Sequence, residues 1–331
     1  MVSFGNLSAQ AGEKSKGFLA VPGTDFTIPA TLICGERPGK TVLISGGVHS
    51  CEYVGIEAAI RLAAELAPAE ICGTVLILHP VNRPGFEART PSIVSRALVP
   101  RLESRAPWIV PWDGCNLNRE FPGRADGSPT QRLAHFFVQE IYPRLDAYID
   151  LHCGEMFESL TPYIYYAASG DEREQQIARE MALCAGLPYM VASKAKGGAY
   201  NYAGAMNIPA VLLERGCQGR WSEGEVQADL DDVRRILRYL GVVESAPQQN
   251  QKPREVVDLV YQLPESAGLW YPKVTAGEFV KEGQLVGVLK DYWGQELSRY
   301  HAPYDGVILF LTHTLWTDGK VEVFTTAREA E

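Results

Sequence analysis

Residues 41–66 read TVLISGGVHSCEYVGIEAAIRLAAEL and join a strand to a helix. The run TVLISGGV is short and continuously apolar, which is typical of a strand buried inside a sheet. Two glycines then allow a tight turn, and YVGIEAAIRLAAEL predicts a helix of about four turns. Its many alanines favour close packing on the sheet. His49 and Glu52 lie on the turn between strand and helix.

The same alternation of apolar runs and helical patterns continues along the chain. Strands are predicted at 16–22, 27–35, 73–81, 146–152, 161–169 and 208–216, and helices at 130–145, 171–186 and 223–241. Buried strands that alternate with helices indicate an α/β fold with a mixed, mostly parallel sheet flanked by helices. We assign this domain to residues 1–243.

The rest of the chain has a different pattern. Residues 244–254, ESAPQQNQKPR, have the composition of a linker. Residues 255–331 contain short extended runs broken by glycine, which predicts a small all-β, barrel-like domain. Parts of it look like a lipoyl or biotinyl carrier domain, but Lys290 stands beside an aspartate and not at an apolar hairpin tip. We therefore expect a scaffold without a swinging arm.

Composition limits the classes of function. The 331 residues are 46% hydrophobic and 21% charged, as in an ordinary globular protein, and the formal net charge is −9. This charge argues against nucleic-acid binding. No apolar run is long enough for a membrane span, and we see no secretion leader. Seven cysteines occur singly, so we expect free thiols and a cytoplasmic location.

The pair His49 and Glu52 has two interpretations. It is either a helix start with an acid in its first turn or a pair of metal ligands. A hydrolytic zinc ion needs three ligands from His, Asp or Glu, with a further position open for water. His152 ends the predicted strand AYIDLH, and strand ends of an α/β sheet meet at one edge. Asp150 shares the face of His152 and could orient its imidazole.

Two further segments carry polar residues of interest. DGCNLNREFPG places Asn118 and Arg119 in a loop, where the guanidinium fits a carboxylate or a polarised carbonyl. IPAVLLERG ends an apolar strand with Glu214, a carboxylate that is costly to bury without a partner or a task. Glu214 is either a general base near the metal or the salt-bridge partner of Arg215.

Taken in order, GGVHSCE, DGCNLNREFPG, DLHCGE and IPAVLLERG resemble the zinc carboxypeptidase superfamily, and most closely its succinylglutamate desuccinylase/aspartoacylase-like branch. The resemblance runs from about residue 40 to 326. It implies one zinc ion per chain, bound by His49, Glu52 and His152. It further implies Asn118 and Arg119 as substrate contacts, Glu214 as the catalytic acid/base, and hydrolysis of an amide in a small N-acyl amino acid.

One segment departs from the family. An insertion at 91–112 makes the second arginine that clamps the substrate ambiguous: Arg89 matches the F-x-x-R arrangement best, and Arg105 is the alternative. The insertion is both arginine-rich and apolar, with Trp108 and Trp112. It is a lid whose tryptophans line an acyl pocket, a solvated loop, or a subunit contact in a homo-oligomer.

Two other functions compete with the deacylase hypothesis. A carboxypeptidase would use the same residues on peptides, unless the C-terminal β domain restricts access to the site. A non-catalytic zinc-binding protein would not need Glu214 or Arg119. Tyr200 and Tyr202 are candidates for an active-site tyrosine, although packing explains them equally simply.

Overall fold

The strand and helix predicted at residues 41–66 form β5 (Arg37–Gly46) and α1 (Tyr53–Glu65) of a computed structural model, which describes residues 1–90, 93, 113–249 and 251–330. β5 is an interior strand with parallel neighbours on both sides, β6 (Cys72–Leu78) and β7 (Ala147–His152). Successive residues of β5 face opposite cores, since Leu43 and Ile44 belong to different hydrophobic clusters. The strand is therefore covered on both faces, as its continuous apolar run predicts.

β5 belongs to a sheet of 13 strands. Its order is β14 (Phe279–Val280), β17 (Gly306–Thr312), β19 (Phe324–Glu329), β12 (Arg254–Gln262), β10 (Tyr189–Ser193), β9 (Tyr163–Ala167), β11 (Ala210–Glu214), β7, β5, β6, β4 (Thr27–Cys34) and β3 (Lys14–Ala20), with β8 (Glu158–Leu160) paired to β17. From β10 to β6 every neighbouring pair is parallel except β9 with β11. The predicted mixed, mostly parallel α/β sheet is confirmed.

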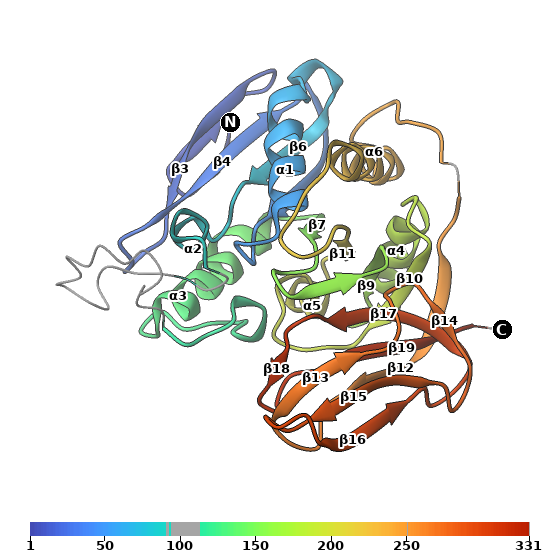
Figure 1. The fold of residues 1–331 in the computed structure, drawn as a ribbon. Helices are drawn as coiled ribbons and strands as arrows, with labels where there is room; N and C mark the ends of the chain where they lie inside the picture. The colour runs from blue at the N-terminus through green and yellow to red at the C-terminus, as the bar shows by residue number, and fades with distance from the viewer. Residues whose placement is uncertain (91–92, 94–112, 250, 331) are drawn as a thin grey trace.

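Helices cover both faces of this sheet. They are α1, α2 (Arg83–Ala88), α3 (Pro129–Phe136), α4 (Glu172–Leu183), α5 (Ala199–Ala205) and α6 (Glu223–Tyr239), and α3 continues into a π-helical segment, Phe137–Ile141. Residues of α1, α4 and α6 share one hydrophobic cluster, and residues of α3, the π-helical segment and α5 share the other. Figure 1 shows α6 beside α1 on the first of these faces. None of the helices in the described part of the chain is long and apolar enough to cross a membrane.

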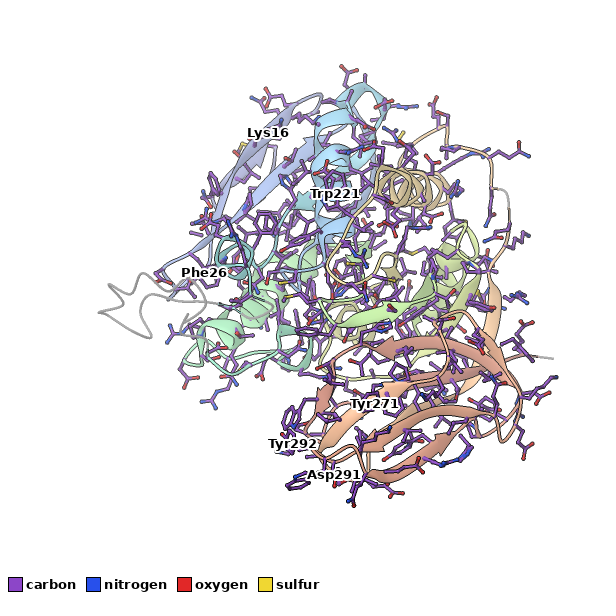
Figure 2. The ribbon with its side chains drawn as sticks, in the orientation of Figure 1. Lys16, Phe26, Trp221, Tyr271, Asp291 and Tyr292 are labelled. Carbon is purple, nitrogen blue, oxygen red and sulfur yellow. The ribbon has the colours of Figure 1, made fainter. Side chains whose placement is uncertain are left out.

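The C-terminal part is entirely β in its described residues, as predicted. β13 (Gly268–Pro272), β15 (Leu285–Lys290), β16 (Glu296–His301) and β18 (Trp316–Thr317) form a four-stranded antiparallel sheet. Residues of this sheet share a small core with the C-terminal strands of the large sheet, and in it the ring of Trp270 stacks on that of Phe324 of β19. Lys290 lies against the ring of Tyr271, and Figure 2 shows Tyr271, Asp291 and Tyr292 in this part, at the bottom of the view.

Four C-terminal strands also extend the large sheet. β12 pairs in parallel with β10, with Tyr189 opposite Arg254, and β19, β17 and β14 follow it. β17 further pairs with β8, so that Leu160 lies opposite Phe310. The C-terminal strands are thus joined to the α/β part by backbone hydrogen bonds, close to the chain that follows β7.

Candidate active site

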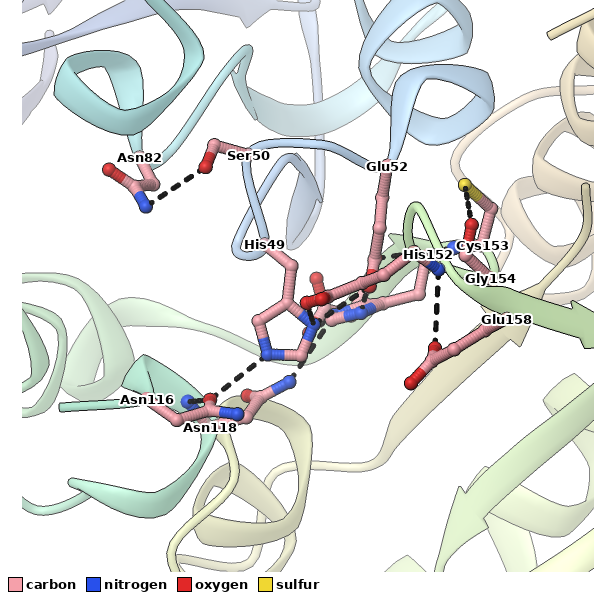
Figure 3. Close-up of polar contacts among 12 residues, drawn as sticks. His49, Ser50, Glu52, Asn82, Asn116, Asn118, His152, Cys153, Gly154 and Glu158 are labelled. Atoms are coloured by element: carbon pink, nitrogen blue, oxygen red, sulfur yellow. Dashed lines mark hydrogen bonds and ion pairs between the residues drawn. The ribbon is translucent and has the colours of Figure 1, made fainter. Parts of the chain in front are cut away.

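Three side chains converge at the carboxyl ends of β5 and β7. His49 lies on the turn after β5, Glu52 caps the start of α1, and His152 is the last residue of β7. Glu52 spans the two imidazoles, with Oε1 2.8 Å from His49 Nδ1 and Oε2 2.7 Å from His152 Nδ1 (Figure 3). One ligand atom from each residue lies within 4.8 Å of the others. This is the spacing of a shared metal site.

The turn after β5 depends on its two glycines. Gly47 has φ +77°, a left-handed conformation that side chains disfavour. A Cβ on Gly46 would lie 2.4 Å from the carbonyl oxygen of Gly55 in α1. The backbones of strand and helix therefore touch directly. This contact fixes the positions of His49 and Glu52 relative to the sheet.

Both imidazoles are held by a second hydrogen bond on the side away from Glu52. His49 Nε2 donates to Asn116 Oδ1 at 3.0 Å, and His152 Nε2 lies 3.1 Å from Asp150 Oδ2. Each ring thus has Nε2 engaged by an oxygen acceptor and Nδ1 turned to the common centre. Such outer partners orient histidines that bind metals. Two oriented imidazoles and a carboxylate fit a zinc ion.

The charges at this centre are strongly coupled. Burial disfavours the charged form of His49, but the Glu52 carboxylate outweighs it and raises the His49 pKa to about 9. The pKa of His152 is raised in the same way, against burial, by Glu52 and Asp150. Burial opposes ionisation of Glu52, but the imidazoles lower its pKa to about 2. A metal ion arriving at the Nδ1 atoms must therefore displace protons.

Glu214 lies next to this centre. It ends β11, and it is the register partner of His152 in the parallel pair of β11 and β7. Paired residues of neighbouring parallel strands project to the same side of the sheet. Burial, with the negative charge of Glu52, raises the pKa of Glu214 to about 8. The carboxyl group can change its protonation state near neutral pH.

Arg215 does not pair with Glu214 among the described residues. Its Nε lies 2.7 Å from Asp229 Oδ1, and its Nη2 contacts Asp232, both on α6. Arg215 and Glu214 have different surroundings because adjacent residues at the end of β11 face opposite sides of the sheet. Arg215 fastens the end of β11 to α6, and Glu214 is left on the side of His152.

The two predicted substrate contacts lie on the turn Leu117–Arg119. Asn118 is buried, and its Oδ1 accepts a hydrogen bond from Ala199 N at 2.9 Å, while its Nδ2 lies 3.5 Å from His152 Nε2. Arg119 is exposed, and its Nη1 donates to the carbonyl of Asn118 at 2.9 Å. No carboxylate within the described chain forms an ion pair with Arg119, so its guanidinium is available to a ligand.

Arg89 ends α2 with a left-handed φ of 58° and an exposed side chain. It lies close enough to Tyr53, the first residue of α1, to oppose the rise that burial causes in the tyrosine pKa. Arg105, Trp108 and Trp112 lie outside the described residues, as does the insertion except for Ile93, which is buried.

The sequence did not identify several residues at this site. Asn116 holds His49 and also caps the turn 117–119, and an asparagine before a helical turn is a usable signal. Tyr261 on β12 bonds to Tyr165 through the hydroxyls at 3.2 Å, and both Arg119 and Glu214 influence its pKa, which burial raises. Nothing in the local sequence around Tyr261 indicates that it lies near these residues.

The two tyrosines named as alternatives, Tyr200 and Tyr202, pack against aromatic rings. Tyr200 stacks on Tyr165 with ring centroids 6.2 Å apart, and Tyr202 lies against Phe121. The side chain of Cys153 is buried in the hydrophobic cluster that contains α1, as strand alternation predicts. All seven cysteines are free.

Comparison with known proteins gives the family of this sequence. The sequence model of the succinylglutamate desuccinylase/aspartoacylase catalytic domain matches residues 38–240. A curated relative, the N-alpha-acetyl-L-2,4-diaminobutyric acid deacetylase of Halomonas elongata, is 28% identical over 88% of this chain and 85% of its own length.

Solved structures share the fold over nearly the whole chain. The product-bound ectoine utilization protein EutE (DoeB) of Ruegeria pomeroyi has a TM-score of 0.83 at 24% identity, covering 98% of this chain and 97% of its own. A succinylglutamate desuccinylase/aspartoacylase of Rhodobacter sphaeroides has a TM-score of 0.84 at 24% identity, covering 98% of each chain. At this identity the likeness concerns the fold alone.

Proposed function

Because the chain belongs to the succinylglutamate desuccinylase/aspartoacylase family, we propose that it hydrolyses the amide bond of a small N-acyl amino acid, with one zinc ion held by His49, Glu52 and His152. The donor set supports this proposal, since both Nδ1 atoms and the Glu52 carboxylate face one another. The curated relative is named as a deacetylase, which is the same class of reaction.

The observation that carries the catalytic assignment is the register of β11 and β7, which brings Glu214 beside His152. When bound, zinc would supply the positive charge that activates water and polarises the scissile carbonyl. Glu214 would accept the proton of the attacking water and pass it to the leaving nitrogen. A carboxyl pKa raised to about 8 suits a group that must both accept and release a proton.

Arginines would hold the substrate. Arg119 and Arg89 are exposed, and neither forms an ion pair among the described residues. Either guanidinium fits the carboxylate of an amino acid or the oxyanion that forms during hydrolysis. The amide oxygen of Asn118 is committed to Ala199 of α5, so its Nδ2, which lies 3.5 Å from His152 Nε2, is the group that would donate to substrate.

A small substrate is favoured over a peptide by the C-terminal strands. Tyr261 reaches the surroundings of Glu214 and Arg119, and β17 pairs with the chain that follows the site. An N-acetylated diamino acid is the first candidate, because the curated relative carries that substrate in its name. The free cysteines support a cytoplasmic location.

A screen of N-acyl amino acids and short peptides on zinc-loaded protein, with a chelated control, tests the proposal. Amide cleavage that is lost on chelation and absent on peptides is the expected result. Glu214→Gln should keep its zinc and lose kcat by about 10²–10⁴-fold. Near-normal turnover in that variant would remove Glu214 from the mechanism, and peptide cleavage would replace the deacylase by a carboxypeptidase.

A further inference from the structure

Glu155 lies beside the three metal-site residues. It follows β7 in the segment DLHCGE, and its Oε1 is 3.6 Å from His49 Nδ1. This is the same nitrogen that faces Glu52 at 2.8 Å. The side chain of Glu155 is 27% exposed. Its carboxylate therefore approaches the donor atom of His49 from a second direction.

The backbone around Glu155 is fixed on both sides. Gly154 N donates to the carbonyl of Gly216 at 3.0 Å, and Glu158 N donates to the carbonyl of Glu155 at 3.0 Å. The carboxylate of Glu158 in turn accepts from Glu155 N at 3.2 Å (Figure 3). Glu158 belongs to β8, where it lies opposite Thr312 of β17. The position of Glu155 is thus set by the sheet and by the end of β11.

The charges around Glu155 are unusual for a carboxylate. No lysine or arginine in the described chain lies within ion-pair distance of it, and Glu52 and Glu158 are its acidic neighbours. Like charges gathered in a partly buried place are unfavourable unless a cation is shared among them. A divalent ion at His49 Nδ1 would be such a cation.

We propose that Glu155 is a further metal-site carboxylate, which strengthens the binding of the zinc ion held by His49, Glu52 and His152. The inference rests on the proposed function for the metal itself. Two neutral histidines and Glu52 place one negative charge against the two positive charges of zinc, and Glu155 makes the balance complete. The protein would then retain zinc at lower free concentrations than the three ligands alone allow.

The test compares zinc affinity in Glu155→Gln with that in Glu172→Gln. The first substitution removes the charge beside His49 and nearly preserves the shape. The second removes an equal charge from the exposed start of α4, away from the site. Chelator competition should show about 10–100-fold weaker zinc binding in Glu155→Gln and wild-type binding in Glu172→Gln.

Cobalt substitution supplies a readout that does not depend on activity. The visible absorption of bound Co²⁺ should change in Glu155→Gln and stay as in the wild type in Glu172→Gln. Melting of the metal-free proteins checks that each variant folds. Glu155→Asp, which keeps the charge with a shorter reach, should fall between wild type and Glu155→Gln in zinc affinity.

Unchanged zinc affinity and an unchanged cobalt spectrum in Glu155→Gln would overturn the inference. A raised KM for substrates that bear an amine, with metal binding intact, would also overturn it and assign Glu155 to substrate recognition. Failure of the proposed function would give a different result. The wild type would bind zinc tightly and Glu155→Gln would bind it more weakly, but the wild type would cleave none of the amides.

Discussion

At the scale of single residues, the charge of Glu52 determines both the orientation and the protonation of the two imidazoles. The carboxylate holds both imidazoles by their Nδ1 atoms, and Asn116 and Asp150 hold them by Nε2. The rings have little freedom to turn. A metal ion bound there would find its donors already oriented, and the cost of binding would lie in removing the protons that Glu52 favours.

Zinc binding should therefore depend steeply on pH. Glu52 raises the pKa of His49 to about 9 and also raises the pKa of His152, so the metal-free protein favours the doubly protonated form of both rings. For each proton released on binding, the logarithm of the zinc affinity rises by about one unit when the pH rises by one unit. We expect zinc affinity to rise about a hundredfold from pH 6.5 to 7.5.

Calorimetry in buffers of different ionisation enthalpy measures the protons released, and about two are expected at pH 7. His135→Ala, which removes a histidine on α3 outside the cluster, serves as the control and should leave this number unchanged. Release of no proton would mean that the imidazoles are already neutral and that Glu52 does not hold them as described.

At the scale of elements, two contacts position the site: α1 against β5 and β7, and β11 against α6. In the first, a Cβ on Gly55 would lie 2.5 Å from the carbonyl oxygen of Leu151. Gly55→Ala must push α1 away from β7, and Glu52 at the start of α1 moves with it. Overpacking of this kind costs about 1–3 kcal/mol of unfolding free energy.

We expect Gly55→Ala to lower both the melting temperature and the zinc affinity. Gly224→Ala is the matched control, because a Cβ at Gly224 in α6 meets no atom within 4 Å. That substitution should be neutral or slightly stabilising. Equal effects of the two substitutions would show that close packing of α1 does not position the site.

The contact between β11 and α6 should contribute strongly to the free energy of unfolding. Asp229 and Asp232 have fully buried side chains, and Arg215 pairs with both. Arg215→Met leaves these carboxylates without that partner and should cost about 3–5 kcal/mol in denaturant unfolding. Arg238→Met, an exposed position on the same helix, should change stability by less than about 0.5 kcal/mol.

The decrease in unfolding free energy caused by Arg215→Met should also depend on pH. Burial raises the pKa of Asp229 to about 7, with Arg215 opposing the rise. A folded state that binds more protons than the unfolded state loses stability as pH rises. The variant should therefore be closer to wild type at pH 5, where Asp229 is protonated, than at pH 8. A pH-independent difference would contradict this account.

The sequence predicts the elements that carry the site better than it predicts their neighbours. β5, β7 and β11 each contain a short, mostly apolar run with a glycine or a polar residue at its end, and α1 has a clear helical pattern. α5, with the sequence AYNYAGA, and β10, with YMVAS, mix small, polar and aromatic residues, so neither shows a clear helical or strand pattern. Asn116 and Glu155 were missed because their contacts with His49 depend on how distant loops fold together.

At the scale of the whole molecule, one sheet runs through both parts of the chain. The sequence shows where the β-rich part begins, but not that β12 pairs with β10, because pairing between strands 65 residues apart, as for Tyr189 and Arg254, leaves no local pattern. The site therefore depends on strands that contribute no metal-site residue. β17 supports the chain from Glu158 to Leu160, and β12 brings Tyr261.

A chain cut after residue 249 should not behave as an independent domain. It leaves the edge of β10 without β12, and an unpaired edge in the middle of a large sheet promotes aggregation. We expect the fragment to sediment as aggregates, while the full chain remains dispersed under the same conditions. A dispersed, folded fragment that binds zinc as tightly as the full chain would show that the β-rich part is dispensable.

The pairing of β8 with β17 also has a consequence for synthesis on the ribosome. His49 is made early, and residue 306, where β17 begins, follows it by roughly 13–50 s at about 5–20 residues per second. Until then the chain around Glu158 has no partner strand, and the nascent chain carries an unfinished centre. We therefore expect the proposed zinc site to reach its full affinity only after β17 has left the exit tunnel and paired with β8.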